Sequence, residues 1–275
     1  MAPFAERFLE RAAERTALCV GIDPSPETLR HWGLTDDVGG LRAFCKAITD
    51  VAARQVAIVK PQSAFFERYG PGGMEELRHT VDAAHAGGAL VLVDAKRGDI
   101  SSTVRAYAEA FLGRDSAFHA DALTATPFLG LAALEPLFTH ARRHDGGVFV
   151  VVRSSNPEGT YIQKARTTDG KEVAAKLAEE ITMLNGEASP GPIGAVVGAT
   201  LGTELADIAA LLPKSLLLCP GIGAQGATME GLTQLLGPHA ARAIPAVSRS
   251  LYEHPDRLNE AIAQHAAALR ALQVK

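Results

Sequence analysis

Eight short apolar runs recur along the chain, and they constrain the fold more than any other feature. Each run is nearly continuous in apolar residues, which is typical of strands buried on both faces of a parallel sheet. The runs cover residues 17–23, 56–60, 89–96, 121–127, 147–155, 193–200, 215–221 and 241–250. Eight buried strands in one chain predict a large parallel sheet or a closed barrel.

The segments between the runs carry helix signals. Amphipathic spacing or flanking glycine predicts helices over 70–88, 101–113, 171–186 and 256–272, and a further helix over about 3–15. Strands that alternate with helices form either an eightfold barrel or a doubly wound open sheet. No linker or charge block marks a domain boundary, and about 250 residues is the usual size of one barrel. We therefore predict an α/β fold, a single (β/α)8 TIM barrel spanning residues 1–275, with an extra N-terminal helix that closes its bottom.

Charge and hydropathy exclude several classes of protein. The 275 residues carry a formal net charge of −4, which argues against a nucleic-acid-binding surface. No apolar run approaches the roughly 18 residues that a membrane-spanning helix needs. The charged N-terminus lacks the apolar core of a secretory signal. Cys19, Cys45 and Cys219 are far apart, so neither a disulfide framework nor a zinc site is expected. These features together predict buried reduced thiols and a cytoplasmic location.

Ionisable residues, among them Arg153 after the fifth run, stand at the ends of several apolar runs, where a barrel enzyme places its chemistry, and they are expected to converge on one mouth. The densest group is Asp94, Lys96 and Asp99, and Lys60 ends the preceding run. Asp94 and Lys96 are two apart on a strand, so both should point to the same side. The four groups would supply two cations and two anions at one mouth. A salt-bridge network at the barrel rim is the structural alternative.

The segment PGIGAQG, residues 220–226, has a G-x-G-x-x-G spacing. A dinucleotide site needs this motif early in the chain with an acid about 20 residues later, and neither condition holds. Barrels commonly bind phosphate with the loops that follow strands seven and eight. Gln225 and Arg249 could supply an amide and a guanidinium to a phosphate dianion there.

Residues 154–170 are long and polar for a loop between strand and helix. They are expected to form either a lid over the mouth or a disordered insertion. Trp32, after the first run, is expected to pack rather than to bind a ligand.

Six motifs occur in order and span nearly the whole chain: GIDP (21–24), VKPQSAFFE (59–67), DAKRGDI (94–100), RSSNPEG (153–159), PGIGAQG (220–226) and SRS (248–250). Together they resemble the orotidine 5′-phosphate decarboxylase family, in particular its second, bacterial subfamily. D-x-K-x-x-D preceded by Lys60 resembles that family's charge tetrad.

The resemblance implies that orotidine 5′-monophosphate loses CO₂ to give uridine 5′-monophosphate, the last step of de novo pyrimidine synthesis. It implies a homodimer of barrels without metal or organic cofactor. Lys96 would donate the proton to C6, within an array completed by Asp94 and Lys60. Asp99 and Thr103 would reach across the dimer into the partner's site.

The resemblance also implies the substrate contacts. The ribose would be bound by Asp23 and Lys60, and the phosphate by Gln225 and Arg249. Ser155 would contact the pyrimidine edge, although the adjacent Ser154 leaves this assignment open by one position. The lid loop, kinetic constants, regulation and assembly beyond a dimer stay open.

This chemistry suits a fixed ammonium group. Loss of CO₂ leaves electrons at C6 in an orbital that no π system delocalises. A positioned ammonium stabilises that charge without reorganising, and it can then deliver its proton. Carboxylates beside Lys96 favour its charged form. Binding energy from a remote phosphate can hold the reacting ring in place.

Two alternatives are weighed against this reading. A Mg²⁺-dependent decarboxylase of keto-sugar acid phosphates shares D-x-K-x-x-D but has a glutamate ligand near the end of strand two. Here that place holds Lys60, which cannot bind Mg²⁺ while protonated. The other is a non-catalytic barrel that binds phosphoribosyl ligands, for which the charge array would be superfluous.

Overall fold

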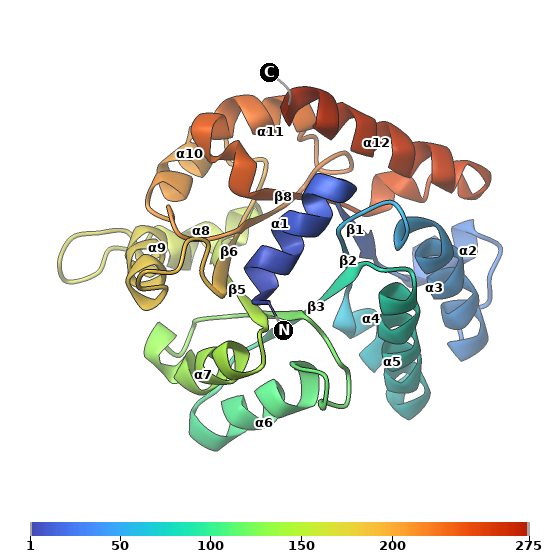
Figure 1. Ribbon diagram of the computed structural model, residues 1–275, viewed down its shortest axis with the longest axis horizontal. Coiled ribbons are helices and arrows are strands. Elements are labelled where there is room, and N and C mark those ends of the chain that lie inside the picture. Colours follow the sequence, from blue (N-terminus) through green and yellow to red (C-terminus); the bar gives the residue numbers. More distant parts are fainter. Residues whose placement is uncertain (1, 274–275) are drawn as a thin grey trace.

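The eight strands form one closed parallel barrel in the computed structural model, which describes residues 2–273 (Figure 1). The strands are β1 (Cys19–Ile22), β2 (Ile58–Pro61), β3 (Leu90–Arg97), β4 (Ala122–Ala125), β5 (Gly147–Arg153), β6 (Ile193–Val197), β7 (Leu217–Pro220) and β8 (Ala243–Val247). Each strand pairs with the next, and β8 closes the barrel onto β1. The predicted TIM barrel is confirmed, and every strand lies within its predicted run or extends one residue beyond it.

Helices surround the barrel and connect consecutive strands (Figure 1). They are α1 (Phe4–Glu14), α2 (Pro26–His31), α3 (Val38–Ala52), α4 (Ser63–Glu67), α5 (Gly70–Ala86), α6 (Ser101–Phe111), α7 (Glu135–Arg143), α8 (Thr160–Gln163), α9 (Val173–Leu184), α10 (Thr203–Ala210), α11 (Met229–Leu236) and α12 (Leu258–Gln273). Local sequence determines where several of these helices begin. For example, the Ser25 and Asp37 side chains accept backbone N–H bonds in the first turns of α2 and α3.

Helix α1 lies across the end of the barrel at which the strands begin (Figure 1). Phe4 and Phe8 are fully buried, and the Phe4 ring meets Phe149 of β5 edge to face at 5.8 Å. Arg7 forms an ion pair of 2.5 Å with Asp121, just before β4. The N-terminal helix therefore closes the bottom as predicted, and the chemistry is left to the opposite end.

The three cysteines are buried free thiols, as predicted. Burial raises the pKa of Cys19 and of Cys219 to about 12, so both thiols stay protonated and unreactive near neutral pH. None of the helices within residues 2–273 has the length and apolar character needed to cross a membrane.

Candidate active site

A cavity of about 250 Å³ opens where the barrel strands end, opposite α1. Its wall includes seven of the nine predicted site residues: Asp23, Lys60, Asp94, Lys96, Ser155, Gln225 and Arg249. They come from the ends of β1, β2, β3, β5, β7 and β8. Residues distant in the sequence are therefore gathered because parallel strands end at the same face of the barrel.

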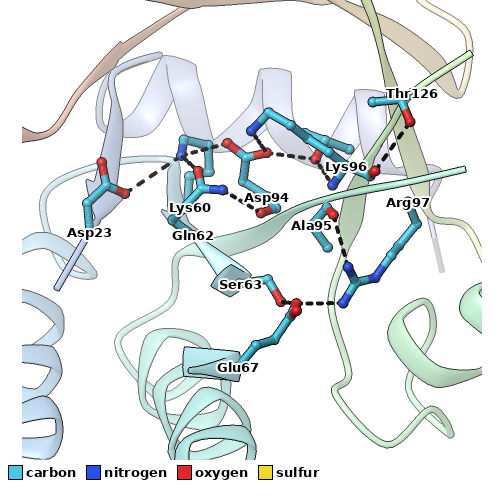
Figure 2. A network of polar contacts seen from close by, with 11 residues as sticks. Asp23, Lys60, Gln62, Ser63, Glu67, Asp94, Ala95, Lys96, Arg97 and Thr126 are labelled. Atoms are coloured by element: carbon cyan, nitrogen blue, oxygen red, sulfur yellow. Dashed lines mark hydrogen bonds and ion pairs between the residues drawn. The ribbon is translucent and has the colours of Figure 1, made fainter. Parts of the chain in front are cut away.

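Asp94 lies between two lysine ammonium groups (Figure 2). Its Oδ2 is 3.0 Å from Lys60 Nζ, and its Oδ1 is 2.7 Å from Lys96 Nζ. Lys60 Nζ also lies 3.9 Å from Asp23 Oδ1. Lys60 is 6% exposed at its side chain and Lys96 is 47% exposed, so only Lys96 presents its ammonium broadly to the cavity.

Two polar residues that the sequence analysis missed hold Asp94 in place. The Thr124 hydroxyl of β4 donates to Asp94 Oδ1 at 2.8 Å and accepts the Lys96 backbone N–H at 2.9 Å. The Gln62 amide donates to the Asp94 carbonyl at 3.0 Å. In the sequence, Thr124 is marked only as a polar residue within an apolar run, and Gln62 only as a polar residue two positions after one.

Opposite charges keep this network ionised despite its burial. Burial opposes the charged form of Asp94, but attraction from Lys60 and Lys96 and their hydrogen bonds outweighs it, so the pKa of Asp94 lies well below its usual value. Burial likewise disfavours the Lys60 ammonium, yet Asp94 and Asp23 raise the pKa of Lys60 well above its ordinary range. Both groups therefore stay charged throughout the neutral range.

Lys96 reaches Asp94 through an irregular backbone and not through regular strand alternation. The register between β3 and β4 shifts between Val93 and Arg97, and Lys96 has φ of 47°. Such bulges re-aim side chains beside active sites. The predicted meeting of Asp94 and Lys96 is thus found, but the alternation argument was incomplete because the strand is not regular there.

The glycine-rich loop after β7 makes a tight turn at the rim of the cavity. Gly221, Gly223 and Gly226 all have positive φ, between 75° and 115°. A Cβ on Gly223 would come within 2.4 Å of the Ser250 hydroxyl, so glycine also permits close approach of the loop after β8. Arg249 is exposed at this rim, and its guanidinium has no hydrogen bond or ion pair to any of residues 2–273.

The two adjacent serines after β5 have different surroundings. Ser154 bonds within its own loop, to Asn156 at 2.7 Å and to Gln163. Both serines line the cavity, but the Ser155 hydroxyl donates across it to Gln225 Oε1 at 3.0 Å, linking the loops after β5 and β7. The geometry therefore favours Ser155 as the group available to a ligand.

The segment 154–170 is folded, so the disordered insertion that was one of the two expectations is wrong, and Ser154 and Ser155 at its start line the cavity. It contains the 3-10 turn η2 (Pro157–Gly159) and α8. The backbone of Arg166 forms an isolated antiparallel β-bridge with that of Glu172. Arg153, at the end of β5, points away from the cavity and pairs with Glu204 at 3.1 Å. The sequence analysis expected every charged strand end to face the mouth, and this one is occupied by a structural ion pair instead.

Asp99 and Thr103 lie outside the cavity of their own chain. Asp99 Oδ1 accepts the Ile100 backbone N–H at 2.7 Å, and among residues 2–273 no lysine or arginine lies within 4.0 Å of its carboxylate. Thr103 is exposed on α6. The second anion near Lys60 within one chain is therefore Asp23, not Asp99.

Tyr252 is a further residue that the sequence analysis missed. Its buried hydroxyl donates to the Gly21 carbonyl and accepts the Asp23 N–H at 3.3 Å. Burial raises the pKa of this phenol well above its usual value, so it stays a donor. Trp32 packs against Tyr252 and Phe44, as predicted for a packing role. Asp23 Oδ1 is itself buried without a hydrogen-bond partner among residues 2–273.

The fold and this site define a (β/α)8-barrel enzyme with a lysine–aspartate array at the mouth of the barrel. Comparison with known proteins makes the assignment specific. Residues 16–263 match the model of the Orotidine 5'-phosphate decarboxylase / HUMPS family. The chain belongs to this family.

The relatives are similar over nearly their full length. An orotidine 5′-phosphate decarboxylase of Myxococcus xanthus is 46% identical, covering 98% of this chain and 96% of the relative. One of Salinispora arenicola is 48% identical over 91% of this chain and 90% of the relative. A crystal structure from Streptomyces avermitilis, described as an orotidine 5′-phosphate decarboxylase, has a TM-score of 0.94 and 44% identity, covering 100% of this chain and 97% of that one.

Replacement of Thr124 by valine tests the support of Asp94. We expect Thr124→Val to lower the free energy of unfolding by about 1–3 kcal/mol, because it removes one hydrogen bond to a buried carboxylate and orphans the Lys96 N–H. Urea denaturation measures the change. Thr126→Val is the matched control, since among residues 2–273 the Thr126 hydroxyl forms a single, long hydrogen bond, to the Lys96 carbonyl at 3.4 Å. Equal effects of the two variants would contradict the role of Thr124.

Proposed function

We propose that the protein decarboxylates orotidine 5′-monophosphate to uridine 5′-monophosphate and CO₂, the last step of de novo UMP synthesis. The observation that carries this proposal is the Lys60–Asp94–Lys96 array, with its carboxylate buried, at the mouth of a barrel from this family. Relatives that are 46% and 48% identical are orotidine 5′-phosphate decarboxylases.

Lys96 is the proton donor in this proposal. When the bond from C6 to the carboxylate breaks, its electron pair stays on C6 and CO₂ departs. The Lys96 ammonium stabilises that charge as it develops, and a proton then moves from Nζ to C6. The 47% exposure of this side chain gives solvent a route to restore the proton.

Asp94 and Lys60 keep Lys96 in place. The Asp94 carboxylate accepts from both ammonium groups, so the position of Lys96 is set before substrate arrives. A fixed donor avoids the reorganisation that water would need around the same charge.

The remaining cavity residues suit the rest of the nucleotide. We assign the ribose to Asp23 and Lys60. The buried Oδ1 of Asp23 has no hydrogen bond among residues 2–273, and a ribose hydroxyl would supply one. Ser155 is assigned to the pyrimidine edge. The phosphate is assigned to Gln225 and Arg249, and the unpartnered guanidinium of Arg249 at the rim supports that role.

A homodimer would bring Asp99 and Thr103 to the partner's site. Both residues lie outside their own cavity, near large exposed apolar side chains. Ile100, Phe128 and Leu129 are 56%, 76% and 55% exposed, and exposed apolar groups of this size commonly mark interfaces. The loops that carry them precede α6 and the 3-10 turn η1 (Leu131–Leu134), which contact each other.

The proposal includes a cytoplasmic location and no metal or organic cofactor. Buried reduced cysteines suit a reducing compartment. Within residues 2–273, His, Cys, Asp and Glu do not form any group of three or more that could hold a metal ion. The Mg²⁺-dependent alternative needs a ligand near the end of β2, where the protonated Lys60 lies. A non-catalytic barrel that only binds phosphoribosyl ligands would not need the Lys60–Asp94–Lys96 array.

A continuous ultraviolet assay with orotidine 5′-monophosphate, with and without EDTA, tests the activity. We expect EDTA-insensitive loss of the orotate absorbance, and we expect Lys96→Ala to lower kcat by at least about 100-fold while the protein stays folded. Lys46→Ala, on an exposed lysine of α3, is the control. Loss of activity in EDTA would favour the Mg²⁺-dependent alternative, and substrate binding without turnover would favour the non-catalytic one.

Arg249→Ala tests the phosphate contact. The variant loses a guanidinium that would bond the dianion, so kcat/KM for orotidine 5′-monophosphate should fall about 10- to 100-fold, the size of one charge-assisted contact. Reaction of the phosphate-free nucleoside orotidine should be unchanged. An equal loss with both substrates would show that Arg249 does not act through the phosphate.

Mixing two inactive variants tests the shared site. Lys96→Ala and Asp99→Ala chains are unfolded together and refolded. Random dimers should recover roughly a quarter of wild-type activity, because half are mixed and each mixed dimer has one intact site. The intact site combines Lys96 of one chain with Asp99 of the partner subunit. If mixing restores nothing, Asp99 acts within its own chain, and wild-type activity of Asp99→Ala alone would show that Asp99 has no role.

A further inference from the structure

Arg97 follows Lys96 directly and forms a second polar network on the outside of the barrel (Figure 2). Its Nη2 donates to Glu67 Oε1 at 2.5 Å, and its guanidinium lies 5.4 Å from the ring centroid of Tyr107 and 5.6 Å from that of Phe111. Both rings belong to α6. Arg97 is therefore held between α4 on one side and α6 on the other.

The Glu67 contact connects the two segments that carry the catalytic lysines. Glu67 ends α4, which begins two residues after β2 and its Lys60. Its carboxylate also accepts the Ser63 hydroxyl at 2.5 Å, so both donors converge on one Glu67 oxygen. The Arg97–Glu67 pair thus ties the end of β3 to the segment after β2.

The backbone at Lys96 needs such an anchor. Lys96 has φ of 47°, a conformation that non-glycine residues adopt only when the surroundings impose it. The register with β4 is interrupted between Val93 and Arg97, so regular pairing does not fix this stretch. It resumes at Arg97, whose carbonyl accepts the Thr126 N–H at 2.9 Å. Arg97 is the first residue after the irregular stretch. Contacts that fix the Arg97 side chain therefore restrain the backbone conformation of Lys96, the residue before it.

We propose that Arg97 is a positioning residue for the reaction: held by Glu67, Tyr107 and Phe111, it sets the location of the Lys96 ammonium against Asp94. The proposal rests on the function proposed above for Lys96. Arg97 does not line the cavity, so it acts through the backbone that it shares with Lys96. A purely stabilising role is the alternative, although ion pairs with side chains 25% and 38% exposed add little stability.

The chain offers a matched control. Arg68 pairs with Asp36 at 2.7 Å and stacks over the Tyr69 ring at 4.7 Å, with side-chain exposure of 37% for Arg68 and 34% for Asp36. It therefore combines the same two kinds of contact as Arg97, and although it follows Glu67 directly, its side chain has no hydrogen bond or ion pair with β3 among residues 2–273. Arg68→Met and Arg97→Met remove equivalent interactions from the fold.

The test compares kcat, KM, affinity for UMP and thermal stability in these two variants, in Arg97→Lys and in Glu67→Gln. Arg97→Met should lower kcat by tenfold to about 100-fold, since displacement of a catalytic group by about 1 Å has effects of that size. KM and the UMP dissociation constant should change by no more than roughly twofold, because substrate contacts stay in place. Arg97→Lys should recover part of kcat, and Arg68→Met should keep wild-type kcat.

A double variant separates action through Glu67 from an independent effect. If Arg97 works through this pair, Glu67→Gln should lower kcat, and its combination with Arg97→Met should be no worse than Arg97→Met alone. Wild-type kcat in Arg97→Met, or losses of kcat and UMP affinity in parallel, would overturn the proposal. Should Arg97→Met fail to fold, Glu67→Gln and Arg97→Lys decide, and unchanged kcat in both would overturn it. Normal turnover by Lys96→Ala would instead refute the proposed function.

Discussion

Asp94 is a carboxylate removed almost completely from water and held between two ammonium groups, and the site depends on this arrangement. Burial opposes the charged form of this carboxylate, and attraction from Lys60 and Lys96 outweighs that effect. The burial of Lys60 is compensated in the same way by Asp94 and Asp23. Asp94 and Lys60 therefore each favour the charged form of the other.

The barrel makes this arrangement possible because it brings strand ends to one face. β2 and β3 are neighbours, so Lys60 and Asp94 meet across one strand pair. Thr124, on the other neighbour of β3, holds Asp94 from the opposite side. The irregular backbone at Lys96 then turns its ammonium to Asp94. The regular strands fix the positions of Lys60, Asp94 and Thr124, and the irregular backbone at Lys96 sets the direction of its ammonium group.

Much of this could be predicted from sequence. Continuous apolar runs gave the strands, and charges directly after those runs gave Lys60, Asp94 and Lys96, because both signals are local. Thr124 and Tyr252 were missed because their importance lies in contacts with residues distant in the sequence. The prediction that Arg153 faces the mouth was wrong, because its partner Glu204 is distant in the sequence and no local pattern indicates the pair. The backbone at Lys96 was missed because alternation assumes a regular strand.

The position of α1 has a consequence for synthesis on the ribosome. This helix is synthesised before β5, yet its Phe4 packs against Phe149 and Gly147, at the start of that strand. Until that strand emerges, the apolar face of α1 has no surface to cover it. The seam between β8 and β1 closes later still, when Ala246 and Val247 become available to Cys19 and Val20. The nascent chain thus exposes apolar surface for most of translation, the condition in which chaperones bind growing polypeptides.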